Sequence, residues 1–350
     1  MKTPRTRYVR VIFGLAALGL MLLAAGFLSR IWEPRYEGRG LSDWIVEFRG
    51  TPESASSVPD KHVTEAFRAM GPKAQRRLLW SARRDSSPWE RHWNRVRGAL
   101  GPVGVRLPMA FDQDTQYWRQ YRNRLSNLLA DLLPESLPVV LQGVHSTRSE
   151  VREVAMSALS SIREPDTQTR DALSGGIEAS DPWVQMAAIG AIRKMKSAGS
   201  FATPALVSAL RRKNPTLTTG SETMTHYVQQ TALIVLGDLG GQAQAALPEI
   251  KAIGLNLPDA YGRVAAARAL WKIETNPSLS FPVLRAEFDA FDPNMKWMIL
   301  ECFREMGTNA ATAIPQVKAF AAAPDTEKYQ KSIALEALKA MQSNPASPNP

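Results

Sequence analysis

The chain has 350 residues, a formal net charge of +10 at pH 7 and a single cysteine. One cysteine excludes a disulfide framework within the chain and a metal site built from several thiolates. The charge is uneven, because residues 1–125 hold 22 Lys or Arg against 11 Asp or Glu, whereas the remaining residues hold 21 against 22.

The N-terminal segment predicts a membrane anchor. An unbroken apolar or small stretch runs from Val11 to Leu28 and would span about 27 Å as a helix, close to the hydrocarbon thickness of a bilayer. Four basic residues precede it: Lys2, Arg5, Arg7 and Arg10. A positive flank favours a cytoplasmic N-terminus. We therefore expect residues 1–10 to be a basic cytoplasmic head, residues 11–29 a single signal anchor, and the rest of the chain to lie outside the cytoplasm.

A cleaved signal peptide is the alternative, because Ala24 and Gly26 are small residues of the kind found at cleavage sites. In that case the mature chain would be secreted or periplasmic. In either case we expect residues 30–60 to form a juxtamembrane segment with a short helix. The proline-rich residues 343–350 are expected to be a disordered tail.

A proline recurs near the start of segments that otherwise read as helix. The frames are LPVV at Pro138, TPAL at Pro204, LPEI at Pro248, FPVL at Pro282 and IPQV at Pro315. Proline is tolerated in the first helical turn, where its missing N–H would have no intrahelical partner. Each frame therefore predicts a helix start, and the separations of 66, 44, 34 and 33 residues predict a repeat.

The partner helix of each repeat follows a second pattern, in which a basic or amide residue precedes small and apolar residues. The pattern begins at Val151, Val184, Val228, Gly262, Met295 and Gln330, in steps of 33, 44, 34, 33 and 35 residues. Its apolar positions lie four, seven, eight and eleven residues after the start, which places them on one helical face. Two looser copies, HVTEAFRAMG and QYRNRLSNLLA, lie upstream. We therefore expect about eight helix pairs within residues 61–342.

Helix pairs with such a period occur in several repeat families. The segments ASDPWVQMAAIGAI, LPDAYGRVAAARALWKI and FDPNMKWMILECFREMG resemble HEAT repeats, in particular the short HEAT-like units first named from phycobiliprotein lyases. The opening RYEGRGLSDWIVEF, followed by AFRAMGPKA, resembles the start of membrane-tethered bacterial HEAT-repeat proteins. The resemblance implies an all-α fold, an α-solenoid of HEAT-like helix pairs. It does not imply one particular function, because such arrays serve many unrelated tasks.

Several charged residues are expected to serve the repeats themselves. Asp181 and Asp292, each followed by proline, and Asp259 at the matching place are predicted helix N-caps. Basic residues stand one position into the second-helix pattern: Arg152, Arg263, Lys296 and Lys331. In the family such acidic and basic positions pair along the stack. We therefore expect these residues to be structural caps and a ladder.

The positive surplus contains the candidate residues for partner binding. These are Arg76, Arg77, Arg83, Arg84, Arg91, Arg95 and Arg97, interleaved with Trp80, Trp89 and Trp93. One interpretation is a solvated face whose tryptophans are used for packing. The other is a surface for an anionic partner, such as lipid head groups, a cell-wall polymer or an acidic protein. Nucleic acid is the third and least favoured partner, because the membrane segment argues against it.

Two segments break the period, residues 85–117 and 213–226, and insertions of this kind usually extend loops on one face of a solenoid. The first contains Asp112 and Asp114, which we interpret as a cap for a helix that begins near Thr115. Two carboxylates alone are a poor metal-binding signal.

The common catalytic motifs are missing from the sequence. The histidines, His62, His92, His145 and His226, have no second ligand at metal-binding spacing and are expected at the surface or at helix ends. Cys302 lies on an apolar helix face and is expected to be a buried hydrophobe. No cofactor is expected. The predicted function is a non-enzymatic, membrane-anchored scaffold for unknown protein partners. A lyase or chaperone-like protein acting on a bound chromophore or protein is the alternative, and nucleic-acid or anionic-polymer binding is a further one.

Overall fold

The computed structural model describes residues 33–49, 61–82, 115–212, 221–290, 292 and 295–343. These residues are mostly helical, with one two-stranded sheet near their start. The chain divides after Ala158 into two compact units. The predicted basic head, the anchor and the tail beyond Ser343 lie outside the described residues. Within the described ranges, no helix is both long and apolar enough to cross a bilayer.

The first unit opens with two short antiparallel strands, β1 (Arg35–Tyr36) and β2 (Arg39–Gly40). Its helices are α2 (Leu41–Arg49), α3 (Lys61–Trp80), α6 (Thr115–Asp131), α7 (Leu137–Val144) and α8 (Ser149–Ala158). Helix α3 is broken at Gly71, whose φ of 72° is a conformation that glycine adopts without strain. Pro72 then begins the second half, where its missing N–H has no helical partner.

Helix α2 belongs to the core of the first unit, although the sequence placed it in a separate juxtamembrane segment. Its buried residues Leu41, Trp44, Ile45 and Phe48 are spaced as one helical face. The Phe48 ring lies 6.5 Å from that of Phe67 on α3 and 5.8 Å from that of Tyr121 on α6. This helix therefore starts the first helix pair, and the packed array begins before residue 61.

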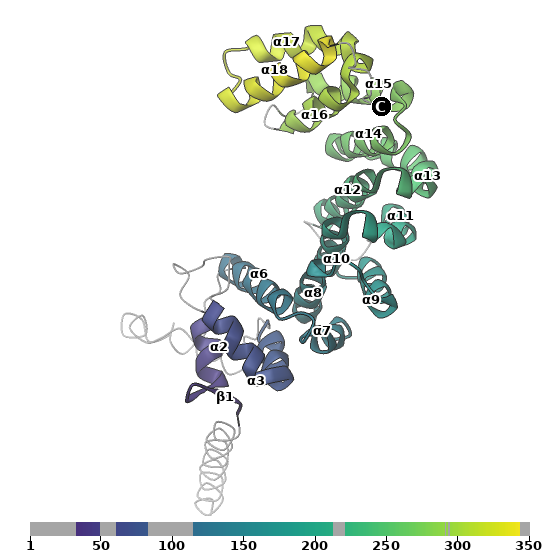
Figure 1. Ribbon diagram of the computed structural model, residues 1–350. Coiled ribbons are helices and arrows are strands. Elements are labelled where there is room, and N and C mark those ends of the chain that lie inside the picture. Colours follow the sequence, from purple (N-terminus) through teal and green to yellow (C-terminus); the bar gives the residue numbers. More distant parts are fainter. Residues whose placement is uncertain are drawn as a thin grey trace, which may run out of the picture. The chain divides into compact units, whose positions relative to one another are not determined.

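The second unit is a stack of helix pairs joined in part by short 3-10 turns. The pairs are α9 (Thr167–Ile177) with α10 (Pro182–Met195), α11 (Thr203–Arg211) with α12 (Ser221–Leu239), α13 (Leu247–Ala252) with α14 (Ala260–Glu274), α15 (Pro277–Ala290) with α16 (Trp297–Met306), and α17 (Ile314–Ala322) with α18 (Lys328–Gln342). The 3-10 segments are η2 (Leu159–Ser161), η3 (Lys196–Ala202), η4 (Gly240–Ala246), η5 (Gly254–Asn256) and η7 (Gly307–Ala313). The first helices α9, α11 and α13 lie on one side of the stack, and the second helices α10, α12 and α14 on the other (Figure 1).

Four of the five prolines expected at helix starts are found there. Pro138, Pro204, Pro248 and Pro315 lie in the first turns of α7, α11, α13 and α17. The prediction for Pro282 is wrong, because it lies inside α15, which begins at Pro277. An earlier start signal explains the difference, since Pro277 supplies a helix-starting proline and the Asn276 side chain accepts a hydrogen bond from the Ser278 N–H, at 3.0 Å.

The two predicted insertions are only partly described. Helix α6 begins at Thr115, where a helix was expected, and residues 83–114 lie outside the described ranges. Helix α12 already begins at Ser221, so the end of the second predicted insertion is helical. Residues 213–220 are likewise not described.

Candidate partner-binding face

The arginines expected to contact a partner are described in part. Arg76 and Arg77 are exposed on α3. Arg77 is also used within the chain, because its guanidinium donates to Ser42 Oγ at 3.3 Å and its Nη1 lies 3.6 Å from Glu33 Oε2. The other five, Arg83, Arg84, Arg91, Arg95 and Arg97, lie outside the described residues, so the proposed basic surface stays a prediction.

Two of the three aspartates expected to cap helices do so. Asp181 Oδ1 accepts from the backbone N–H groups of Trp183 and Val184, at 2.8 and 3.4 Å. Asp259 Oδ1 accepts from the Gly262 N–H at 2.6 Å. Asp292 does not hold the N-cap position of α16, which begins at Trp297 with Lys296 at that position; residues 293 and 294, which directly follow Asp292, lie outside the described ranges, so its role as a cap stays a prediction. A backbone turn precedes that helix, in which the Asp292 carbonyl accepts from the Met295 N–H at 2.8 Å.

The basic or amide residue one position after the start of the second-helix pattern donates a side-chain hydrogen bond that links the two helices of a pair. Arg152 donates to the Ser146 carbonyl at 2.8 Å, and Arg263 donates to the carbonyls of Leu257 and Pro258, both at 2.9 Å. The amides do the same, since Gln185 donates to Ile177 O and Gln229 to Leu210 O, both at 2.9 Å. These carbonyls follow or end the first helix of each pair, where intrahelical partners run out.

The expected acid–base ladder is therefore found only in part at these positions. Arg263 also pairs with Glu287 of α15, at 2.6 Å. Lys296 differs, because it is 9% exposed and its ammonium lies over the rings of Phe288 and Phe320, 4.7 and 5.3 Å from their centroids. Burial lowers the pKa of this ammonium group, and the negative ring faces stabilise its charge. Lys331 is half-buried in the first turn of α18.

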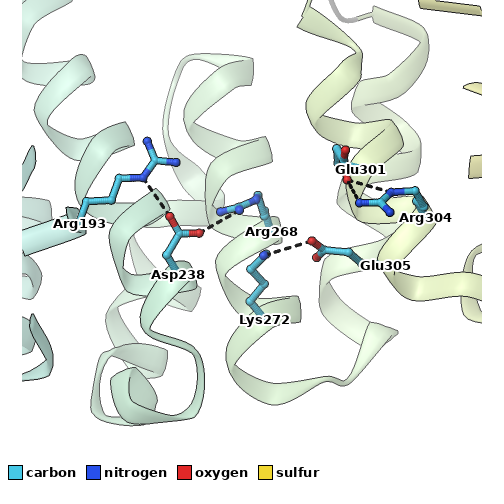
Figure 2. A network of polar contacts seen from close by, with 7 residues as sticks. All are labelled: Arg193, Asp238, Arg268, Lys272, Glu301, Arg304 and Glu305. Atoms are coloured by element: carbon cyan, nitrogen blue, oxygen red, sulfur yellow. Dashed lines mark hydrogen bonds and ion pairs between the residues drawn. The ribbon is translucent and has the colours of Figure 1, made fainter. Parts of the chain in front are cut away.

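A charge ladder does cross the second helices, but nearer their C-terminal ends. Asp238 of α12 pairs with Arg193 of α10 at 3.0 Å and with Arg268 of α14 at 2.9 Å. Lys272 of α14 then pairs with Glu305 of α16, at 3.2 Å. Figure 2 shows these contacts together with the pair of Glu301 and Arg304 within α16, at 2.6 Å. Because Asp238 is shared by two arginines, it couples three successive repeats.

Aromatic side chains stand in the N-terminal halves of the same second helices. We call this set the aromatic row: Trp183, Tyr227, Tyr261, Trp297 and Tyr329. Trp183, Tyr227, Trp297 and Tyr329 are 46, 51, 42 and 48% exposed, and Tyr261 is half-buried. Large apolar side chains that recur at the surface are more informative than single ones. The recurrence on α10, α12, α14, α16 and α18 places one such ring on each repeat of the second unit.

A pocket of about 410 Å³ opens beside the aromatic row. Its lining consists of His226, Tyr227, Gln230, Thr231 and Ile234 from α12, Asp259 and Tyr261 at the start of α14, and Met295. Gln230 Nε2 donates to Asp259 Oδ1 at 2.6 Å, and His226 Nδ1 lies 4.0 Å from Asp259 Oδ2. Burial raises the pKa of Tyr261, so its hydroxyl stays protonated at neutral pH.

Other reactive groups are held in inert surroundings. Cys302 is buried on α16, and burial raises the pKa of its thiol to about 12. A thiol with that pKa stays protonated at neutral pH and is a poor nucleophile. Across the ranges that the structure describes, no group of three or more His, Cys, Asp or Glu is placed to hold a metal ion.

Comparison with known families identifies the repeat. The family described as HEAT repeats matches residues 137–225, which run from α7 into α12. These residues carry HEAT repeats. No curated protein sequence matches the chain.

The chain is also similar to solved structures. The crystal structure of Kap121p is 15% identical with a TM-score of 0.52, and the similarity covers 85% of this chain but 33% of Kap121p. The complex of CpcE and CpcF of phycocyanin lyase from Nostoc sp. PCC7120 is 18% identical with a TM-score of 0.43, over 66% of this chain and 91% of that one. An engineered protein is 18% identical with a TM-score of 0.40, and the similarity covers 88% of this chain and 90% of the engineered one. The likeness to Kap121p concerns the fold alone.

Sequence reasoning missed both the aromatic row and the charge ladder, although a signal for each is present. In the register of the HEAT repeats, Trp183, Tyr227, Tyr261 and Tyr329 all stand one residue before the pattern start. The ladder residues Arg193, Asp238, Lys272 and Glu305 stand nine or ten residues after it. Aligning the repeats on positions outside the apolar stripe would have found both sets.

Proposed function

We propose that this HEAT-repeat protein is an interaction scaffold that binds an extended segment of a partner protein along the aromatic row. The observation that carries the proposal is the exposure of a tryptophan or tyrosine in the N-terminal half of four of the five second helices described in the second unit. Trp and Tyr offer large contact areas with few side-chain rotors, which is why they dominate binding hot spots. The repeat core does not need them, because its apolar stripe lies elsewhere on each helix.

The spacing of the row suits an extended chain. Packed helices lie about 8–10 Å apart, and an extended polypeptide rises about 3.3 Å per residue. About three residues of a partner would therefore cross one repeat. The full row would take up a segment of about 12 to 15 residues on the same arithmetic.

The scaffold is tested by replacing four row residues together, W183A, Y227A, W297A and Y329A. We expect crosslinking to the full-length variant to capture at least about tenfold less partner protein than crosslinking to the parent, since hot-spot residues dominate affinity. The matched control is the triple variant V46A, L279A and L335A, which removes exposed apolar side chains outside the row. Equal capture of the same protein by the row variant and the parent would refute the proposal.

We also propose that the stretch from Val11 to Leu28 holds the scaffold at a membrane. The length of this stretch and the basic residues before it support the proposal. Fused after Pro350, a reporter that works only outside the cytoplasm should be active, and a reporter that works only in the cytoplasm should be inactive. Removal of the positive charges by K2Q, R5Q, R7Q and R10Q should reduce this preference. A reporter active only in the cytoplasm would reverse the topology, and a mature chain that begins near Phe27 would establish cleavage.

A lyase or chaperone-like activity on a bound chromophore or protein is the second candidate. The observation that favours it is the pocket, where the side chains of His226 and Asp259 lie near two tyrosines. Binding of a bilin to the purified chain, lost on H226Q, would support this candidate over the scaffold. If the absorption spectrum of the bilin does not change when the protein is added, the result would count against this second candidate.

A further inference from the structure

We infer that the pocket between α12 and α14 binds a cationic side chain, Lys or Arg, presented by the partner segment on the aromatic row. The inference rests on the proposed function and adds the chemistry of one contact. Tyr227 and Tyr261 belong both to the row and to the pocket lining, so a segment on the row passes over the pocket. A volume of about 410 Å³ is ample for one long side chain.

The carboxylate of Asp259 favours a ligand that carries a charged hydrogen-bond donor. Asp259 is the carboxylate in the lining, and the ion pair that the structure gives it is with His226, at 4.0 Å. Asp259 Oδ2 is buried and has no hydrogen-bond partner among the described residues, so this oxygen can accept a hydrogen bond from a donor that a ligand supplies. The arginines around the pocket already have carboxylate partners: Arg193 and Arg268 share Asp238, and Arg263 pairs with Glu287 and also interacts electrostatically with Asp259. A Lys or Arg donor from a partner would therefore satisfy the open acceptor of Asp259.

The aromatic groups favour the same ligand. A Lys or Arg side chain is attracted to the negative face of a tyrosine ring. The stem of the side chain is apolar and can lie along Ile234 and Met295 in the lining while its head reaches Asp259. Gln230 Nε2 donates a hydrogen bond to Asp259 Oδ1 at 2.6 Å, so the carboxylate is already oriented before a ligand binds.

The experiment uses the full-length protein in detergent with ring-labelled tyrosines, and methylguanidinium as the probe. We expect saturable shifts of the Tyr227 and Tyr261 ring resonances, which are assigned with Y227F and Y261F. The neutral probe N-methylurea should shift them at least fivefold less at the same concentration. The variant D259N should weaken methylguanidinium binding at least fivefold, because asparagine keeps the helix cap but removes the charge.

Two further variants make the result decisive. D181N makes the same change at the cap of α10, which does not line this pocket, and should bind the probe like the parent. Y227L removes an exposed ring and should weaken binding even if D259N alters folding. Equal response to both probes, no saturable shift, or parent-like binding of methylguanidinium by either D259N or Y227L would overturn the inference. If the row variant loses the partner while D259N binds the probe and the partner like the parent, the scaffold proposal stands and this inference alone fails.

Discussion

Replacing Phe303 by alanine is expected to destabilise the second unit by about 3–5 kcal/mol, which is the usual cost of removing a large buried aromatic ring. Phe303 is fully buried on α16, and its ring lies 5.8 Å from the rings of Phe281 and Phe288 on α15. The substitution would leave a cavity where the two helices of this pair meet. Urea unfolding followed by circular dichroism would measure the loss.

The matched control for F303A lies on the same helix. Trp297 is 42% exposed, so W297A removes a ring of similar size that the core does not enclose. We expect W297A to cost less than about 1 kcal/mol, as for most surface changes. Equal losses for the two variants would mean that the burial assigned to α16 is incorrect.

Replacing Ala266 by leucine is expected to destabilise the second unit by about 1–3 kcal/mol, because it overpacks the core. Ala266 is fully buried on α14, and its methyl group lies 2.8 Å from where a Cβ on Gly254 would stand. Helix α14 and the turn η5 are thus too close for a larger side chain. Since each repeat is stabilised by its neighbours, the unfolding transition should broaden as well as shift.

The control for A266L is A286L, because Ala286 is exposed on α15, next to α14. Leucine is a good helix former, so this variant should unfold within about 0.5 kcal/mol of the parent. A melt of A266L that superimposes on that of A286L would show that the register assigned to this repeat is wrong.

Helix starts were predictable because their signals are local. The caps at Asp181 and Asp259 and the prolines at the heads of α7, α11, α13 and α17 act within one turn of the chain. The same locality explains the failure at Pro282. Two prolines five residues apart both permit a helix start, and the pattern alone did not choose the earlier one.

Pairing between repeats was less predictable. The sequence showed that acidic and basic residues recur, but Lys296 lies over two phenylalanine rings and Arg152 bonds a backbone carbonyl. What a long side chain contacts depends on which groups the neighbouring helix presents. In the ladder of Figure 2, the partners of Asp238 come from helices 30 and 45 residues away.

The sequence by itself determined the period, the helix class and most helix starts, because each depends on residues within one or two turns. Only the tertiary structure decided which aromatic residues are exposed. Trp44 and Trp183 both stand on amphipathic helices, yet Trp44 is fully buried and Trp183 is 46% exposed. The difference arises because exposure depends on whether a distant helix covers the side chain. For the same reason the pocket beside Asp259 required the packing of α12 against α14, whose lining residues are separated by about 30 positions in the chain.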